Sequence, residues 1–469
     1  MNNNVNTPNA KYVWKDIDLE ELRQVKDQPS DDAVNSIFKS ESMKDLVSRL
    51  KKMAKNDEKP KPNEFPAAME GFINQELTRS FTEHDIAMFN RTHEIWKEHG
   101  TNFIFILFFR ALPYTYMAEK PANVLRMTRL LEAHAERRII ETAQFVFDVM
   151  DKDWWTPKHR GILTALKIRI MHSAMRHVIL DSDKDGEKWN DDWGKPISQE
   201  DLIATNQVFS LEFFKGMTMM GETLSKEDQE AWFHTWKTIG KIMGVQDDLL
   251  CPTVEEAWTL QHAVYAHLFK DDTHSGILLA KALVETLHKN FHMPEKLALY
   301  LMKEMLADEQ FPDCFQRMLG PSYSKKHPEL FKSFDTKAAS SDHKAKLRKN
   351  FQGHSKDYHN TMQGKKSAII NKHVKFKFLK GLLDWAMKLM GLSKKKVHML
   401  DMQLDIMHRL LHDIESGEPK EQLEDDAVEE LMAAFGGVIV SILSAHFRKG
   451  KESGFRIPKT LQENWALKG

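Results

Sequence analysis

The chain has 469 residues, of which 41% are hydrophobic, and its 67 basic side chains nearly balance its 68 acidic ones. A chain of this length can bury a sizeable core, and the near-zero net charge excludes a general nucleic-acid binder, which would be strongly basic. Glycine (21) and proline (16) are scarce, whereas Met (25), Phe (27) and Trp (11) are plentiful. This composition favours a mostly helical protein.

The cysteine content and the first residues indicate the cellular compartment of the protein. Only two cysteines occur, Cys251 and Cys314, too few for a disulfide framework. Residues 1–15 are polar and asparagine-rich and lack the basic and apolar regions of a secretory signal. We therefore expect a cytoplasmic protein and leave open a peripheral association with a membrane.

Composition divides the chain into four parts. Residues 1–62 read as a charged N-terminal extension, and residues 63–320 carry the core. Residues 321–375 form a basic insertion, either a mobile solvated segment or a surface that meets anionic lipid or a partner. Residues 376–469 are expected to add helices that pack on the core.

Apolar residues recur at helical spacing throughout the core. In chain order, the predicted helices are 83–99 with the Phe-rich run 103–109, then 130–150, 161–181, 199–221, 227–244 and 254–268. Ser198, with Asp201 three residues later, predicts a capping-box helix start, and Ser225 predicts another start. Alternating β-branched stretches are few, so the predicted fold class is all-α.

Two apolar runs raise the question of a membrane span. Residues 101–109 are too short to cross a bilayer. Residues 431–447 carry no formal charge, but 17 residues is the lower limit for a span. Because two glycines, two serines and a histidine interrupt this second run, we interpret it as a buried core helix.

The segment 161–181 holds the first candidate site. It is apolar nearly all round, so it should be buried, yet Arg169, His172 and Arg176 share one side of it. An imidazole between two arginines suits a haem, with the histidine as axial ligand to iron and the arginines on the propionates. The alternatives are a satisfied core histidine, arginines paired with Asp or Glu of another helix, and His177 as the ligand instead.

The segment 131–150 holds the second candidate site. Arg138, Glu141 and Thr142 share a face with Phe145 and Val149. A charged donor, a carboxylate and a hydroxyl are suited to orienting oxygen and moving protons in a catalytic site. The alternative is a helix surface on which Arg138 and Glu141 form an ordinary ion pair.

Other site chemistries find no matching motif. The sequence has no Gly-rich phosphate loop, no CxxC and no pair of Glu-x-x-His motifs for a di-iron bundle.

The residues around His172 resemble a known family. The string LTALKIRIMHSAMRH is similar to the haem-ligand helix of the latex-clearing-protein and MpaB-type oxygenases, in which Arg, His and Arg recur as Arg169, His172 and Arg176 do here. The upstream family pattern of Arg, a variable polar position and Thr matches Arg138, Glu141 and Thr142. The segments 193–209 and 236–250 and the closing FRIPKTLQENW also resemble family segments.

The resemblance implies a globin-like helical core around haem b and a (di)oxygenase that uses O2 on carbon–carbon double bonds. His172 would be the proximal iron ligand and the only metal-binding residue. Arg169 and Arg176 would serve haem binding, and Arg138, Glu141 and Thr142 would form the catalytic side of the pocket. The substrate would be apolar and isoprenoid-like, or an unsaturated lipid.

Two departures from the family pattern change what we expect of the distal site and of the substrate. Rubber-cleaving members have Lys, which can close the distal site, where this chain has Glu141. Their additional distal acid has no match at Lys120-Pro121-Ala122. Those enzymes are also secreted, so a small intracellular terpenoid or lipid is expected here rather than solid rubber.

The sequence therefore leaves three alternative functions. The first is a haem b oxygenase acting on an apolar alkene. The second is a haem-binding sensor, store or peroxidase-like protein without alkene cleavage. The third is a haem-free helical interaction protein that uses its basic insertion as a contact surface. The oligomeric state is left open.

Overall fold

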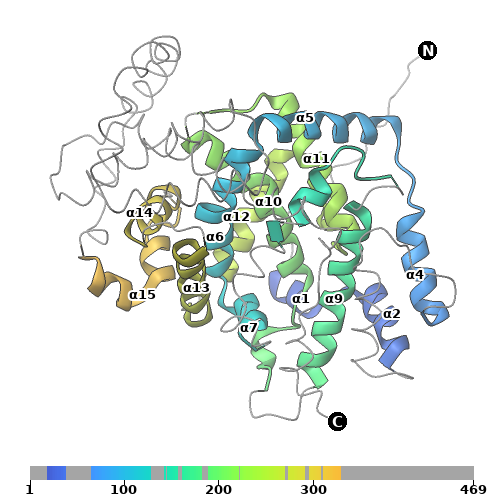
Figure 1. Cartoon of the computed structure of the whole chain (residues 1–469). Coiled ribbons are helices and arrows are strands. Elements are labelled where there is room, and N and C mark those ends of the chain that lie inside the picture. Colours follow the sequence, from blue (N-terminus) through green and yellow to red (C-terminus); the bar gives the residue numbers. More distant parts are fainter. Residues whose placement is uncertain are drawn as a thin grey trace, which may run out of the picture.

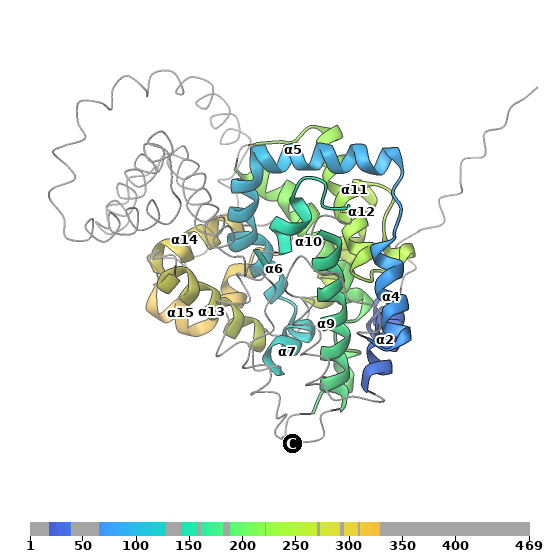
Figure 2. The same cartoon turned by 45° about the vertical axis from the view of Figure 1, so that its right-hand side comes forward.

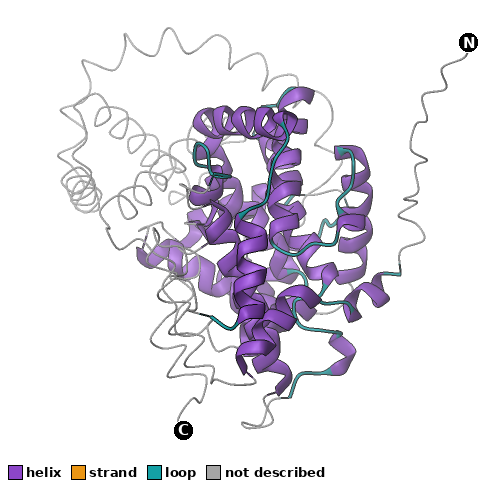
Figure 3. Ribbon diagram, turned by 90° about the vertical axis from the view of Figure 1, so that its right-hand side faces the viewer, coloured by secondary structure: helices purple, strands orange, loops and turns teal. Residues whose placement is uncertain are grey.

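The fold is built from helices alone in every part of the chain that the structure covers. A computed structural model describes residues 18–38, 65–127, 142–143, 145–156, 161–181, 188–220, 222–269, 273–290, 295–307 and 310–328. No strand occurs among these residues, and Figure 3 shows helices joined by loops. The predicted all-α class is confirmed.

Three N-terminal helices form one side of the molecule. They are α1 (Leu19–Gln24), α2 (Gln28–Phe38) and α4 (Ala67–Leu77). Helices α2 and α4 pack on each other and on α9 (Gly161–Asp181), whereas α1 packs on α10 (Gln199–Met219). Figure 2 shows α2 and α4 beside α9. Residues 18–38 are called the N-terminal strap below.

The central layer begins with α5 (Glu83–Ile106), which crosses the top of the molecule in Figure 1. A capping box between Thr82 and Asp85 starts this helix. It runs into a π-helical turn, η2 (Leu107–Ala111), and then α6 (Leu112–Tyr116). A π turn carries one extra residue per turn, is uncommon and often lies at a functional site.

Two serine caps fix the next helices. The Ser198 side chain accepts from the backbone N–H of Asp201 at the start of α10, and Ser225 accepts from Asp228 at the start of α11 (Lys226–Ile242). Helix α12 (Val254–Leu268) follows and packs on α10. Both predicted helix starts are confirmed.

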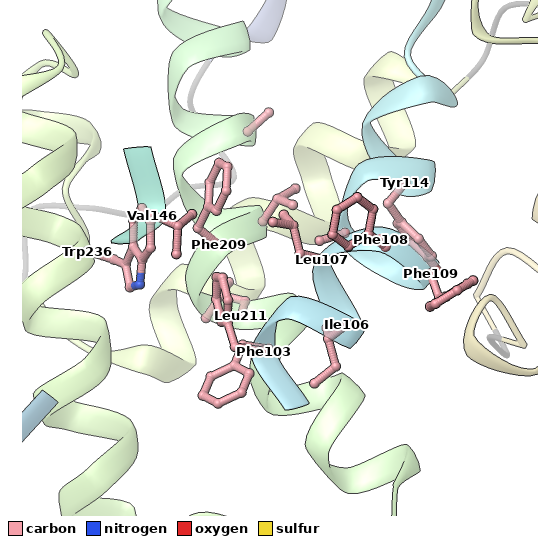
Figure 4. Close-up of a cluster of buried hydrophobic side chains, with 14 of the residues drawn as sticks. Phe103, Ile106, Leu107, Phe108, Phe109, Tyr114, Val146, Phe209, Leu211 and Trp236 are labelled. Atoms are coloured by element: carbon pink, nitrogen blue, oxygen red, sulfur yellow. The ribbon is translucent and has the colours of Figure 1, made fainter. Parts of the chain in front are cut away.

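The largest core cluster lies between these helices. Aromatic and aliphatic side chains from α5, η2, α10 and α11 interleave there, as Figure 4 shows for Phe103, Leu107, Phe209 and Trp236. The rings of Phe209 and Trp236 stack at 4.8 Å. The Phe-rich run of the sequence is therefore core packing.

The remaining helices close the other side. They are α7 (Glu119–Met127), α13 (His274–Asn290), α14 (Glu295–Met305) and α15 (Cys314–Lys326), with short 3-10 turns at Asp191–Trp193 and Asp247–Leu249. Helix α15 bends at Gly320, whose φ of 69° favours glycine. The change of composition at residue 320 therefore coincides with a kink, and Pro321 to Lys326 continue the helix beyond it.

Several predictions fall outside the described residues. These are the apolar run 431–447, the C-terminal helices within 376–469 and the basic insertion from residue 329 onward. Within the part that is described, no helix is long and apolar enough to cross a membrane. The four-part domain division and the globin-like arrangement stay predictions.

Candidate active site

Helix α9 lies between two layers because it is apolar on both sides. Leu163, Leu166 and Ile170 are buried against α2 and α4, whereas Ile162 and Ala165 belong to the central core. The helix is buried over most of its length, so each polar group along it must find a partner inside the protein.

His172 lies near the middle of α9. By helical spacing it shares a face with Ala165 and Ile168, which point toward the central core. Its side chain is half-buried, and the Nδ1 atom lies inside the protein. An imidazole in this position has the chemistry of an axial ligand to haem iron.

Arg169 is held by carboxylates from two N-terminal elements. Its Nε and Nη2 donate to the two carboxylate oxygens of Asp27 at 2.6 and 2.8 Å, and its Nη1 donates to Glu76 of α4 at 3.1 Å. The same Nη1 also donates to the carbonyl of Ile242 at 3.2 Å. Burial would lower the pKa of Arg169, but the hydrogen bonds and charges of Asp27 and Glu76 outweigh it and raise that pKa.

Arg176, one helical turn beyond His172, is also held by a carboxylate of the N-terminal strap. Its Nε donates to Asp31 of α2 at 2.9 Å, and Nη2 lies 2.8 Å from the same carboxylate. Nη2 also donates to Ser173 at 2.7 Å, and Nη1 donates to the carbonyl of Ile197 at 3.0 Å. Arg176 is only 1% exposed, so this set of partners offsets a large desolvation cost.

The sequence left two kinds of partner open for these arginines, haem carboxylates or carboxylates of the protein. In the structure, carboxylates of the N-terminal strap and of α4 take most of their donors. Arg169 and Arg176 thus fasten α9, and with it His172, to the N-terminal helices.

His177, the alternative ligand, lies on another side of α9. Its ring stacks on Phe38 at the end of α2, with centroids 4.1 Å apart and planes 7° apart. Packing against the N-terminal strap gives this histidine a structural role, so His172 remains the better candidate.

The second candidate segment is described in part. Arg138 and Glu141 lie outside the described residues, whereas Thr142 is half-buried and helical, and residues 145–150 are helical as well. Figure 4 shows Val146 of this stretch beside Phe209 and Trp236 in the central core. Thr164 of α9 donates to Asp148 at 2.7 Å, both buried, so this stretch is hydrogen-bonded directly to α9.

The sequence alone did not identify which carboxylates hold α9. Asp27, Asp31, Glu76 and Asp148 are all at most 9% exposed. The available signal was weak: Asp27 and Asp31 are four residues apart in a charged extension, and their distance in sequence from α9 hides the pairing.

His172 fits the expected haem ligand, whereas the two arginines differ from the expected partners of the haem propionates. A histidine supported by two anchored arginines on a rigid, buried helix is a suitable iron ligand. Within the described ranges, no three His, Cys, Asp or Glu side chains cluster so as to hold a metal ion by themselves. The N–H groups of both arginines, however, donate mostly to protein acceptors. Arg169 and Arg176 would therefore hold the ligand helix in place more than they would bind the haem propionates.

The part of the chain that contains α9 matches known proteins. Residues 96–335, slightly more than half of the chain, match the family described as "ER-bound oxygenase mpaB/B'/Rubber oxygenase, catalytic domain". Over 128 residues, the chain is 30% identical to the rubber oxygenase of Streptomyces sp. (strain K30). That match spans 27% of this chain and 30% of the relative, less than a third of its length.

A solved structure of latex clearing protein LCP in the closed state is similar with a TM-score of 0.53. The superposition covers 71% of this chain and 91% of the other at 20% identity. At that identity, the likeness shows a shared helical fold.

Proposed function

Because this chain belongs to the family of mpaB and rubber-oxygenase catalytic domains, we propose that it is a haem b-dependent oxygenase of apolar alkenes. Its substrate would be a small isoprenoid-like compound or an unsaturated lipid, with O2 as the second substrate. The observation that carries the proposal is His172, half-buried at the centre of the buried helix α9 and inside the matching span.

His172 would hold the iron. When bound, the haem supplies the redox chemistry with O2. The protein contributes a fixed ligand position: Asp27 and Glu76 hold Arg169, and Asp31 holds Arg176. Arg169 and Arg176 would thereby serve haem binding by preventing α9 from shifting.

Arg138, Glu141 and Thr142 would act on the substrate side. The Glu141 carboxylate would accept and return a proton. The Arg138 guanidinium and the Thr142 hydroxyl would orient oxygen atoms of the reactants. The hydrogen bond from Thr164 to Asp148 would keep this segment in register with α9.

The test is oxygen uptake by the haem-loaded protein with unsaturated isoprenoids, and carbonyl products identified by mass spectrometry. The proposal predicts uptake that depends on the alkene, with none from the saturated analogue of the same chain length. A haem spectrum without alkene-dependent uptake would instead assign the protein to the sensor, store or peroxidase-like class. No haem after reconstitution would leave the haem-free interaction protein.

A further inference from the structure

A cavity of about 440 Å³ lies among helices other than α9. Its lining comes from η2, α6, α10, α11, α12 and the segment that precedes α15, and it includes no residue of α9. Figures 1 and 2 both place α10 between α6 and α9. The cavity is therefore separate from the site around His172, and its volume is within the range of small-molecule pockets.

The floor of the cavity is charged, which apolar packing does not require. Arg110 of the π turn donates through Nε to Glu212 of α10 at 2.6 Å, and the hydroxyl of Tyr265 donates to the other oxygen of Glu212 at 2.8 Å. Arg110 also donates through Nη1 to the carbonyl of Met305 at 2.7 Å. All three side chains are at most 3% exposed, and a buried ion pair of this kind rarely adds net stability over apolar packing.

The protonation of the Tyr265 hydroxyl is fixed by its surroundings. Burial and the neighbouring charge of Glu212 raise the pKa of Tyr265 well above its usual range, so its hydroxyl stays protonated and donates. A donor cation and an acceptor anion thus lie side by side next to the cavity.

The walls are aromatic. Tyr114, Phe214, Trp258 and Phe311 line the cavity, and the Arg110 guanidinium lies 4.6 Å from the ring centre of Tyr114. Lys215, which is half-buried, also lines it, and His262 and Thr218 are exposed lining residues. Aromatic walls favour an apolar ligand body.

We propose that this cavity is a second ligand site, which binds an apolar molecule carrying one uncharged hydroxyl group. A hydroxyl is uncharged and both donates and accepts, so it can donate to Glu212 without disturbing the ion pair. A carboxylate in the same place would face the Glu212 anion, and a pure hydrocarbon would leave both polar groups without a new partner. The ligand class is therefore an apolar alcohol.

The experiment is equilibrium dialysis of the full-length protein with radiolabelled farnesol, an uncharged isoprenoid alcohol. Farnesoic acid is the charged comparison. The wild type is expected to bind one equivalent of farnesol at this site and to bind the acid at least about 10-fold more weakly, a difference of about 1.4 kcal/mol.

Two matched variants locate the binding. Thr218 and Thr259 are exposed helical threonines whose hydroxyls donate to the carbonyl four residues earlier, but only Thr218 lines the cavity. Thr218→Trp fills the mouth and should lose the equivalent of farnesol, whereas Thr259→Trp should keep it. Wild-type binding by Thr218→Trp, or acid binding as tight as that of the alcohol, would overturn the proposal.

A third variant separates this site from the proposed function. His172→Ala should still bind the equivalent of farnesol that Thr218→Trp loses, because no residue of α9 lines the cavity. Loss of that equivalent in His172→Ala, with retention in Thr218→Trp, would place the ligand at α9 and refute a second site. Should the protein prove to lack haem, farnesol binding would still be expected.

Discussion

The attachment of α9 to the N-terminal strap can be tested by removing a single charge. In Asp31→Asn the side chain keeps its shape, but Arg176 loses the carboxylate that lies 2.8 Å from its Nη2. Arg176 and Asp31 are 1% and 5% exposed, so water cannot replace the lost charge. The variant leaves a guanidinium buried with only neutral acceptors.

The expected cost follows from that burial. Breaking a buried ion pair by removing one partner costs about 3–5 kcal/mol. Asparagine retains an amide oxygen that can still accept, so we expect about 2–4 kcal/mol, with the carbonyl of Ile197 and the Ser173 hydroxyl unchanged as acceptors. Asp27→Asn should cost less, because Arg169 keeps Glu76 at 3.1 Å.

Urea unfolding measured by circular dichroism gives the free energy of unfolding, provided that the slope with denaturant is unchanged. Asp32→Asn is the matched control, since Asp32 is the next residue of α2, is exposed and bonds only to Gln28 among the interactions found. It should change stability by less than about 0.5 kcal/mol. Equal effects of the two variants would refute the assignment of Asp31 as an anchor of α9.

Three further predictions concern other parts of the molecule. Gly244 has a φ of 95°, and an added Cβ would overlap a carboxylate of the N-terminal strap, so Gly244→Ala should cost at least about 1–3 kcal/mol in thermal unfolding. Gly71→Ala, in open space on α4, should instead stabilise by up to about 1 kcal/mol. The hydrogen bond to Glu200 raises the pKa of His267 above its model-peptide value of 6.5. Its stabilisation is therefore complete below pH 6.5 and lost as pH rises through the raised value, and His267→Gln should flatten that part of the stability–pH curve. Glu141→Gln should slow turnover more than it weakens haem binding, and equal losses in kinetics and haem titration would make its role structural.

The long central helices α5 and α9 to α12 could be predicted because their apolar residues recur at one period, and polar caps mark the starts of some of them. Ser198 and Ser225 are examples, since a capping hydrogen bond spans only three residues. The π turn at Leu107–Ala111 could not be predicted, because it continues the apolar run that ends the α-helix before it. Tertiary packing of that run decides where the extra residue is accommodated.

The candidate site was predictable in its residues but only partly in its partners. The burial of Arg169 and Arg176 followed from the apolar helix around them, and burial required anions. Which anions those are depends on contacts between residues up to 145 apart in sequence, which no local pattern records. The cavity beside Arg110 was missed for the same reason, since its floor joins η2, α10 and α12.

The central claim is that His172 holds a haem, and an absorption spectrum with a pyridine haemochrome assay tests it most directly. The protein would be reconstituted with haem alongside His172→Ala and, as the control on the same helix, His177→Ala. We expect a b-type spectrum at one haem per chain in the wild type and in His177→Ala, and its loss in His172→Ala. Full haem with an unchanged spectrum in His172→Ala would contradict the assignment.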